Sequence, residues 1–431
     1  MHMLLPRVII AADRSGSGKT TATAALMRKL SKTKKVRGFK AGPDYIDPGY
    51  HRVATGTPAA NLDLWMMGEK GVMNSLAKYG KGFDISVIEG VMGLYDGAGG
   101  KYSTFELAKV TGTPIVAVID ASGMSTTAGA VVKGLIDYRG AEVKGVIFNK
   151  VSSERHYLEC ASSLPEGVKP LGYLPKRAEI QVEERHLGLL TVEDNSRAER
   201  IVKTAEESLI LDVDDLVNIA TTARDLPDAP EENREQKGRA AVAYDSAFSF
   251  YYLQNLDAIR SKYEIEFFSP LNNEVPKEVD FIYLGGGYPE LHLSELEAAT
   301  ATKTWLLEQI NMGTKVFGEC GGLMFLGKRL LRDGRDYRMV GALDVEIETK
   351  SKLTIGYTEL EAVKDNLISR EGSRIRGHEF HVSKVVSYNE RPVFRNRLGK
   401  GLGDGWDGLQ VQNALGTYSH FLFANLPKFL S

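Results

Sequence analysis

The sequence predicts a two-domain α/β protein in which each domain is built on a mainly parallel sheet. Three observations support this prediction. Short apolar runs alternate with helical stretches along most of the chain, which is typical of parallel sheets covered by helices. A glycine-rich loop follows the first apolar run, and a glycine-framed cysteine follows one of the later runs. At 431 residues, the chain is also too long for a single ordinary core.

The first domain is expected over residues 1–223, with strands buried on both faces of the sheet. Its near-continuous hydrophobic runs are residues 7–12, 84–89, 114–119 and 143–148. Residues 224–238 contain two prolines, many acids and little that is apolar, so we expect a solvated linker there. A second domain is expected over residues 239–431, where further strands are predicted at 239–245, at 279–284 and directly before Cys320.

Composition excludes several classes of protein. The 54 basic and 56 acidic residues leave no electrostatic footprint for nucleic acid or an anionic membrane. No apolar stretch approaches the roughly 20 residues that span a bilayer, and no signal peptide is visible. The two cysteines form no disulfide framework and suit a reducing cytoplasm, where we expect this protein. Cys160 is expected on a helix with a structural role.

A variant phosphate-binding loop follows the first predicted strand. It ends in Gly-Lys-Thr, so that backbone N–H groups would hold phosphates while Lys19 reaches the terminal phosphate and the Thr20 hydroxyl holds Mg²⁺. The strict pattern has glycine where this chain has Asp13. Because strand, loop and helix come in the required order, we expect ATP to bind here. The expected nucleotide contacts are Ser15, Gly16, Ser17, Gly18, Lys19, Thr20 and Thr21.

Loop acids are candidates for metal and substrate binding beside the phosphates. Glu89 ends a buried strand, where it would hold Mg²⁺ together with Thr20. Asp44 and Asp47 lie three residues apart in a Gly/Pro loop, and Asp96 lies in a second loop. These three acids are either turn formers or contacts to metal or substrate, and Asp44 is the further candidate for Mg²⁺.

Cys320 is predicted to be a nucleophile. It lies in Gly-Glu-Cys-Gly-Gly between an apolar strand and an apolar helix, and so tight a turn requires glycine neighbours. At such an elbow we expect an exposed thiol near the positive end of a helix, which favours the thiolate. The alternative is a buried and inert cysteine.

A cysteine nucleophile requires a base and an oxyanion hole. The residues alone leave three candidate bases open, which are His378, His381 and His420. Backbone N–H groups for the oxyanion are expected in the Gly-Gly-Gly-Tyr-Pro-Glu turn after a strand and beside the cysteine. The candidates are Gly286, Gly287 and Gly321.

Taken in order, these motifs resemble the cobyrinate a,c-diamide synthase family over residues 7–425. Gly-Gly-Gly-Tyr-Pro-Glu-Leu, Gly-Glu-Cys-Gly-Gly and Gly-Thr-Tyr-Ser-His are similar to its class I glutamine amidotransferase domain. The family's ATP-dependent synthetase domain is similar to four further segments, which are residues 39–48, 89–97, 120–125 and 185–189. The resemblance implies a P-loop NTPase domain of the dethiobiotin-synthetase type, followed by a class I glutamine amidotransferase-like domain.

For the site residues, the resemblance implies that His420 activates Cys320. It makes His378 and His381 weaker candidates for the catalytic base. Many class I amidotransferases carry a glutamate two residues after this histidine, but here that position is Leu422, which leaves a dyad. Asp44, Tyr45, Asp47 and Asp96 match the family's loops around the reacting carboxylate and phosphate. Arg14 stands where partition-type ATPases carry a lysine that reaches a partner's nucleotide, so a homodimer stays open.

The implied activity is amidation of the a and c side chains of a tetrapyrrole polycarboxylate with ATP, Mg²⁺ and L-glutamine. Cobyrinate in cobalamin biosynthesis and nickel-sirohydrochlorin in the biosynthesis of the methanogenic nickel coenzyme are both acceptors of close relatives. The metal there belongs to the substrate. Two further hypotheses stay open, which are an adenosylcobyrate-type amidase and a partition-like ATPase switch with a non-catalytic second domain. The switch predicts a lost nucleophile or base, whereas Cys320 and His420 are both present.

Overall fold

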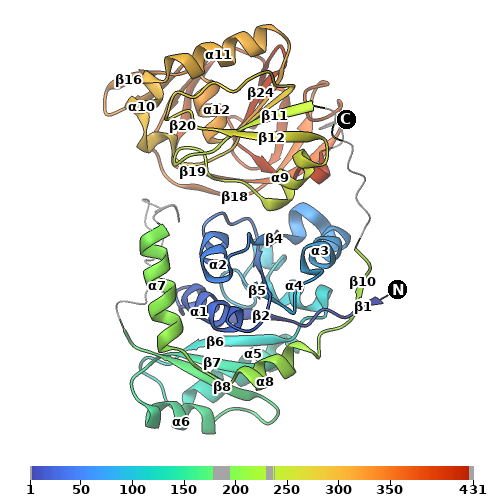
Figure 1. Ribbon diagram of the computed structural model, residues 1–431, viewed down its shortest axis with the longest axis vertical. Coiled ribbons are helices and arrows are strands. Elements are labelled where there is room, and N and C mark those ends of the chain that lie inside the picture. The colour runs from blue at the N-terminus through green and yellow to red at the C-terminus, as the bar shows by residue number, and fades with distance from the viewer. Residues whose placement is uncertain (1, 178–194, 230–235, 237, 427–431) are drawn as a thin grey trace. The chain divides into compact units, whose positions relative to one another are not determined.

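The computed structural model describes residues 2–177, 195–229, 236 and 238–426, and the chain forms two compact units that divide between residues 231 and 232 (Figure 1). Both units contain sheets and helices, so the predicted α/β class is confirmed. The division falls inside the segment expected as a linker. That segment begins with ordered chain, because β10 (Leu226–Pro227) pairs antiparallel with β1 (His2–Met3). Within the described residues, no helix is long and apolar enough to cross a membrane.

The first unit is built on an eight-stranded sheet in the order β4-β3-β5-β2-β6-β7-β8-β9, parallel except for β9. The four hydrophobic runs predicted as strands are β2, β5, β6 and β7, and their residues are almost all buried. The strands of this sheet are β2 (Arg7–Ala12), β3 (Val36–Ala41), β4 (Ala60–Leu62), β5 (Ile85–Glu89), β6 (Ile115–Asp120), β7 (Val143–Val151), β8 (Lys169–Pro175) and β9 (Ile210–Leu211).

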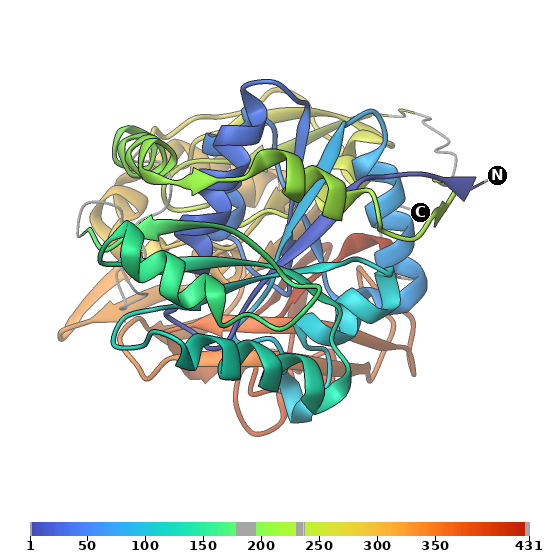
Figure 2. The same cartoon turned by 90° about the horizontal axis from the view of Figure 1, so that it is seen from below.

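Helices lie on both sides of this sheet (Figure 2). They are α1 (Lys19–Ser31), α2 (Asp47–Thr55), α3 (Leu64–Gly80), α4 (Thr104–Thr111), α5 (Thr127–Arg139), α6 (Glu154–Ser162), α7 (Asn195–Ser208) and α8 (Val213–Ala220), with a short 3₁₀ turn at η1 (Ala98–Gly100). Side-chain caps set several of their starts, as where Ser103 and Glu106 form a capping box. Cys160 lies buried on α6, in agreement with the structural role expected for it.

Arg7 joins separate parts of the first unit although it is fully buried at the start of β2. Its guanidinium donates to the carbonyls of Thr111 and Arg224, each at 2.6 Å, and to Thr113 Oγ1 at 3.0 Å. Burial lowers the pKa of Arg7 to about 10, which leaves the side chain charged at neutral pH.

We expect Arg7→Leu to reduce the free energy of unfolding by about 3 kcal/mol, because buried carbonyls would lose a charged donor. A urea titration measures the loss, with Arg52→Leu as the control, since Arg52 is exposed on α2. The control should stay within about 0.5 kcal/mol of the unmodified protein. A loss below about 1 kcal/mol for Arg7→Leu would contradict this role.

The second unit contains a six-stranded sheet in the order β12-β11-β13-β14-β24-β23, in which only β23 is antiparallel to its neighbour. The strands predicted at 239–245, at 279–284 and before Cys320 are β11, β13 and β14. The strands of this sheet are β11 (Gly238–Ala243), β12 (Tyr263–Phe268), β13 (Phe281–Leu284), β14 (Lys315–Glu319), β23 (Leu409–Val411) and β24 (Ala414–Thr417).

Two smaller sheets and short helices complete this unit. One sheet has the order β22-β21-β18-β19-β25, with β18 (Thr354–Ala362), β19 (Arg374–His381), β21 (Phe394–Leu398), β22 (Trp406–Asp407) and β25 (His420–Phe421). The other has the order β16-β15-β17-β20, with β15 (Arg329–Arg332), β16 (Arg335–Arg338), β17 (Val345–Glu348) and β20 (Lys384–Tyr388). The helices are α9 (Leu253–Arg260), α10 (Leu293–Ala298), α11 (Thr300–Asn311) and α12 (Gly321–Leu326), with 3₁₀ turns η3 (Pro289–Leu291) and η4 (Phe423–Asn425).

Both main sheets place their candidate residues at the carboxyl ends of parallel strands. In the first unit, the loops that follow β2, β3, β5, β6 and β7 meet at one edge of the sheet. In the second unit, the loops after β13 and β14 meet at an equivalent edge. Ligands of open α/β sheets bind at this edge, and the candidate sites of both units lie there.

Candidate active site

The phosphate-binding loop runs from Asp13 to Gly18 between the buried strand β2 and helix α1. Gly18 has φ 85°, and a Cβ at this position would lie 2.0 Å from Asn149 Nδ2, so only glycine fits. Asn149 lies near the end of β7, and its side-chain amide donates to the carbonyl of Ser17 at 2.9 Å. Asp13, the departure from the strict motif, accepts a hydrogen bond from Ser17 Oγ at 2.6 Å. The variant residue therefore stabilises the loop from within.

Thr20 and Glu89 lie together at this edge, as the expected magnesium site requires. Thr20 Oγ1 donates to Glu89 Oε1 at 2.7 Å, and Glu89 is fully buried at the end of β5. Burial and the nearby Asp47 push the pKa of Glu89 up, but Lys40 and His51 outweigh them and hold it below its ordinary value. Glu89 is therefore a carboxylate at neutral pH, with an oxygen directed at the Thr20 hydroxyl.

Lys40 is the central cation of a cluster with Asp44, Asp47 and Glu89, called here the Lys40 cluster. The sequence pattern did not predict this role for Lys40. Its ammonium lies 2.6 Å from Asp47 Oδ2, 3.3 Å from Glu89 Oε1 and 3.9 Å from Asp44 Oδ2, although the side chain is only 2% exposed. His51 Nε2 is 2.6 Å from Glu89 Oε2. The available signal was a lone lysine in the otherwise apolar second half of strand β3, because a buried charge requires partners.

The two other loop acids, Asp44 and Asp96, have different surroundings. Asp44 Oδ1 accepts from the backbone N–H groups of Ile46 and Asp47, so one of its oxygens does form a turn. Asp96 is exposed and accepts from the backbone N–H of Gly93 within its own loop, and no contact joins it to the Lys40 cluster in the described structure. Tyr45 is half-buried between Asp44 and Asp47 in the chain.

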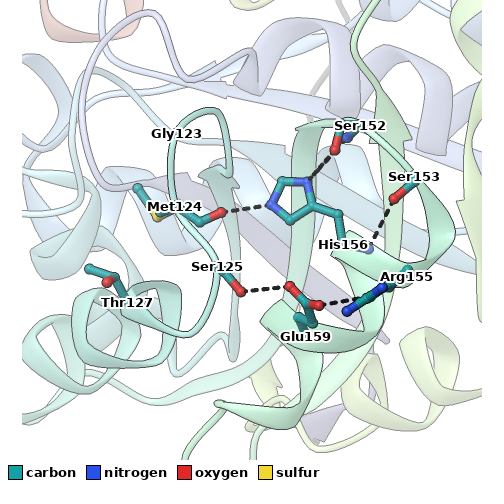
Figure 3. Close-up of a pocket in the computed structure, with 9 residues that line it drawn as sticks. All are labelled: Gly123, Met124, Ser125, Thr127, Ser152, Ser153, Arg155, His156 and Glu159. Carbon is teal, nitrogen blue, oxygen red and sulfur yellow. Dashed lines mark hydrogen bonds and ion pairs between the residues drawn. The ribbon is translucent and has the colours of Figure 1, made fainter.

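A pocket of about 580 Å³ opens between the loops after β6 and β7 (Figure 3). Its polar groups satisfy one another: His156 lies 2.6 Å from the Met124 carbonyl, and Glu159 accepts from Ser125 and Arg155. The strand order β2-β6-β7 places β7 two strands from the phosphate loop, which is about 10 Å. The pocket therefore lies at the same edge of the sheet as the phosphate loop.

Cys320 forms the strained elbow that the sequence predicts between β14 and α12. Its backbone has φ 50° and ψ −96°, which is unusual for a residue with a side chain. A Cβ on Gly318 would lie 2.8 Å from the Gly322 carbonyl carbon, and one on Gly322 would lie 2.1 Å from the Leu284 carbonyl oxygen. The glycine frame is thus required by close approach of the backbone.

The expectation of an exposed thiolate at this elbow is wrong. Cys320 is only 3% exposed, and its Sγ lies 3.6 Å from the Phe380 carbonyl. Burial raises the pKa of Cys320 far above its ordinary value, and the nearby Glu290 raises it further. Helix α12 has only six residues, and its N-terminus does not offset these effects. The resting thiol is therefore protonated, so that it requires a base.

His420 and His378 lie side by side on paired strands of one sheet. They are direct partners in the antiparallel pairing of β19 with β25, and their rings stack with centroids 4.9 Å apart. Burial lowers the pKa of His378 to about 3 and that of His420 well below its ordinary value, so both rings are neutral in the resting protein. His381 instead stacks on Tyr418 with centroids 4.1 Å apart.

The three glycines expected at the oxyanion hole lie in two turns that approach each other, and one of these glycines contacts His420. A Cβ on Gly286 would lie 2.5 Å from His420 Cε1, so this glycine makes room for the imidazole. A Cβ on Gly321 would lie 3.3 Å from the backbone nitrogen of Gly287. The turn after β13 and the turn after β14 therefore bring backbone N–H groups together beside Cys320, which is what an oxyanion hole requires.

Comparison with known proteins agrees with both units. A family described as CobB/CobQ-like glutamine amidotransferase domain matches residues 239–428, and one described as CobQ/CobB/MinD/ParA nucleotide binding domain matches residues 8–190. The cobyrinate a,c-diamide synthases of Sulfolobus acidocaldarius, Saccharolobus solfataricus and Sulfurisphaera tokodaii are 54%, 53% and 51% identical to this chain. The alignments cover 100%, 98% and 100% of each protein and of this chain.

A nucleotide-binding domain joined to a glutamine amidotransferase domain defines an ATP-dependent amidoligase that uses glutamine as nitrogen donor. Within that class, the chain belongs to the cobyrinate a,c-diamide synthase family. The segment 185–189, which carried part of the expected resemblance, lies outside the described residues.

Proposed function

We propose that this protein converts cobyrinate to its a,c-diamide, with ATP activating each carboxylate and glutamine supplying each nitrogen. The single observation that carries the proposal is the presence of two candidate sites in one chain. One is a phosphate loop whose Thr20 contacts Glu89 of the buried Lys40 cluster, and the other is a cysteine elbow at which Glu319, the residue before Cys320, lies 3.9 Å from His420 Nδ1. Relatives more than half identical over the whole chain bear the name cobyrinate a,c-diamide synthase.

The first unit is proposed to make an acyl phosphate, since a carboxylate is a poor electrophile. A carboxylate oxygen of the substrate attacks the γ-phosphorus of ATP, and ADP leaves. Lys19 and the backbone of residues 15–18, with Thr21, hold the phosphates. Lys40, which is ion-paired with Asp47 and Glu89, is proposed to stabilise the charge on the transferring group. Asp44, Tyr45, Asp47 and Asp96 are the proposed contacts to the substrate.

Magnesium fits this site on the chemistry of its donors. Within the described residues, no group of three or more His, Cys, Asp or Glu side chains could hold a metal alone. Mg²⁺ in such sites takes one or two protein oxygens and completes its shell with phosphates and water. Thr20 and Glu89 would hold it, with Asp44 Oδ2 as a third oxygen. When bound, it would neutralise phosphate charge.

The second unit is proposed to release ammonia from glutamine. His420 accepts the thiol proton as Cys320 attacks the side-chain amide carbonyl, and the oxyanion is held by backbone N–H groups at Gly286, Gly287 and Gly321. The proton passes to the departing ammonia, leaving a thioester that water cleaves to glutamate. Ammonia then attacks the acyl phosphate, phosphate leaves, and an amide forms.

Coupled product release tests the proposal. With ATP, Mg²⁺ and glutamine present, adding cobyrinate should raise ADP and glutamate formation together, with two of each per diamide. Both products are measured in the same samples. ADP formation that does not respond to cobyrinate would contradict the proposed activity.

A further inference from the structure

The position where many amidotransferases carry an acid for the catalytic histidine is apolar in this chain. Two residues after His420 stands Leu422, a buried apolar side chain. A histidine that serves as a general base usually has a third group that orients its ring and stabilises its protonated form. This requirement is strong here, because burial disfavours the imidazolium form of His420 and lowers its pKa.

We propose that Glu319, the residue directly before the nucleophile, is the positioning carboxylate of His420. Its Oε2 lies 3.9 Å from His420 Nδ1, and both side chains are completely enclosed in the second unit. The proposal rests on the proposed function, since it assigns a role within glutamine hydrolysis by Cys320 and His420.

Strand pairing fixes the place of Glu319. It ends β14, where it pairs with Thr417 of β24, three residues before His420. The backbone N–H of Cys320 donates to the Thr417 carbonyl at 2.7 Å, which ties the elbow to the same turn. The carboxylate ends one of two neighbouring parallel strands, and the nucleophile and the base lie in the segments that directly follow β14 and β24.

Two donors hold the carboxylate in this orientation. The hydroxyl of Tyr283 donates to Oε2 at 2.6 Å, and the backbone N–H of Phe421 donates to Oε1 at 2.9 Å. Phe421 is the immediate neighbour of His420, so the histidine backbone and the carboxylate are fixed together. Both hydrogen bonds favour the ionised form of Glu319, which is the form that stabilises an imidazolium.

Glu319 acts on the thiol through the histidine. A negative charge next to Cys320 raises the thiol pKa, so the carboxylate does not favour a free thiolate. Once the proton has moved from sulfur to His420, the same charge faces a cation. At 3.9 Å the two groups are not hydrogen-bonded in the resting protein. A small rotation of the imidazole as it takes the proton would complete the bond.

Glu379 is a further acidic side chain near these histidines, and its charge raises the pKa of His420, but its contacts differ from those of Glu319. Its carboxylate accepts from the backbone N–H groups of Lys400 and Gly401 and lies 3.6 Å from His381 Nε2. It follows His378 on β19, and successive side chains of a strand point to opposite faces. Glu379 therefore supports the loop at Lys400, and Glu379→Gln controls for the loss of a buried charge that acts on His420 from the opposite face of β19.

The pH profile of glutamine hydrolysis is expected to show the titration of Glu319. Burial raises its pKa to about 8, against the two hydrogen bonds that lower it. Deprotonation turns Glu319 into the partner that His420 requires, so kcat/KM should rise with a midpoint near pH 8. The other titratable side chains around Glu319, Cys320 and His420 are Tyr251, Tyr283, Glu290, His378, Glu379, His381 and Asp407.

Of these neighbours, Glu290 requires separate treatment. Burial raises the pKa of Glu290 to about 7, and it also acts on Cys320. Burial raises the pKa of Tyr251 and Tyr283 well above 10 and lowers that of the two histidines that stack on each other, so these four stay neutral between pH 7 and 9. Glu290 and Asp407, whose pKa burial also raises, are distinguished from Glu319 by substitution, because the limb of the pH profile that Glu319→Gln removes is the one that belongs to Glu319.

The test compares Glu319→Gln with Glu379→Gln in the full-length protein. Glu319→Gln is expected to lower kcat for glutamine hydrolysis about 100-fold or more, with KM for glutamine within about threefold and the limb near pH 8 lost. Glu379→Gln should keep the limb and stay within about fivefold in kcat. Amidation supported by ammonium should persist in both variants, since it does not use this site.

A kcat within about fivefold for Glu319→Gln, or an unchanged limb near pH 8, would overturn the proposal. If Glu319→Gln does not fold, the pH profile of Tyr283→Phe tests the proposal instead. Loss of the Tyr283 hydroxyl removes a bond that lowers the Glu319 pKa, so the limb should move to higher pH, and a fixed limb would overturn the assignment. Glutamine hydrolysis that survives in Cys320→Ala would instead defeat the proposed function.

Discussion

Cys320→Ala is expected to abolish glutamine-supported amidation and to spare amidation supported by added ammonium at raised pH. The loss should be about 10³-fold or more, because a covalent intermediate requires the nucleophile. Ammonium activity should remain because the phosphate loop and the Lys40 cluster lie in the other unit. Both rates are read from the amidated product under matched conditions.

The chain provides its own control for this experiment. Cys160 is the other cysteine, buried on α6 in the first unit. Cys160→Ala should support amidation with glutamine and with ammonium at nearly the rates of the unmodified protein. Glutamine-supported product from Cys320→Ala would show that another group attacks glutamine. Loss of the ammonium activity as well would show that Cys320 does more than supply nitrogen.

Lys40→Met is expected to abolish amidation with either nitrogen source. Phosphoryl transfer depends on cations placed where charge develops, and removal of one such group costs about 10²–10³-fold in kcat. The change also leaves Asp47 and Glu89 without their buried cation, so some loss of stability should accompany it. Glutamine hydrolysis measured alone should continue, because Cys320 and His420 lie in the other unit.

The control for Lys40 is Lys144→Met, which removes an exposed lysine from β7 of the same sheet. It should leave amidation within about twofold, since exposed substitutions away from a site have small effects. Thermal melting of both variants separates unfolding from lost chemistry. A folded Lys40→Met protein that amidates at more than a tenth of the normal rate would contradict the role given to this lysine.

The sequence was sufficient to predict the strands and the elbow because both depend on local patterns. Buried parallel strands are recognisable as unbroken apolar runs, as in β2 and β6. The elbow at Cys320 is recognisable because its neighbours Gly318 and Gly322 approach other backbone too closely for any side chain. These features follow from residue type and order alone.

The features that the sequence did not predict depend on how separate segments meet. Cys320 is buried where its Sγ meets the Phe380 carbonyl of β19, sixty residues further along the chain. The Lys40 cluster forms only when the ends of β3 and β5 lie side by side. Glu319 was visible in the motif, but the pairing of β14 with β24 is what brings it to His420.

The mass of the product made from cobyrinate tests the central claim most directly. Purified protein is given ATP, Mg²⁺ and glutamine with cobyrinate, and in parallel with nickel-sirohydrochlorin. The account predicts a cobyrinate product lighter by the difference between two hydroxyl and two amino groups, with the new amides on the a and c side chains. Unchanged cobyrinate, or conversion of nickel-sirohydrochlorin alone, would contradict it.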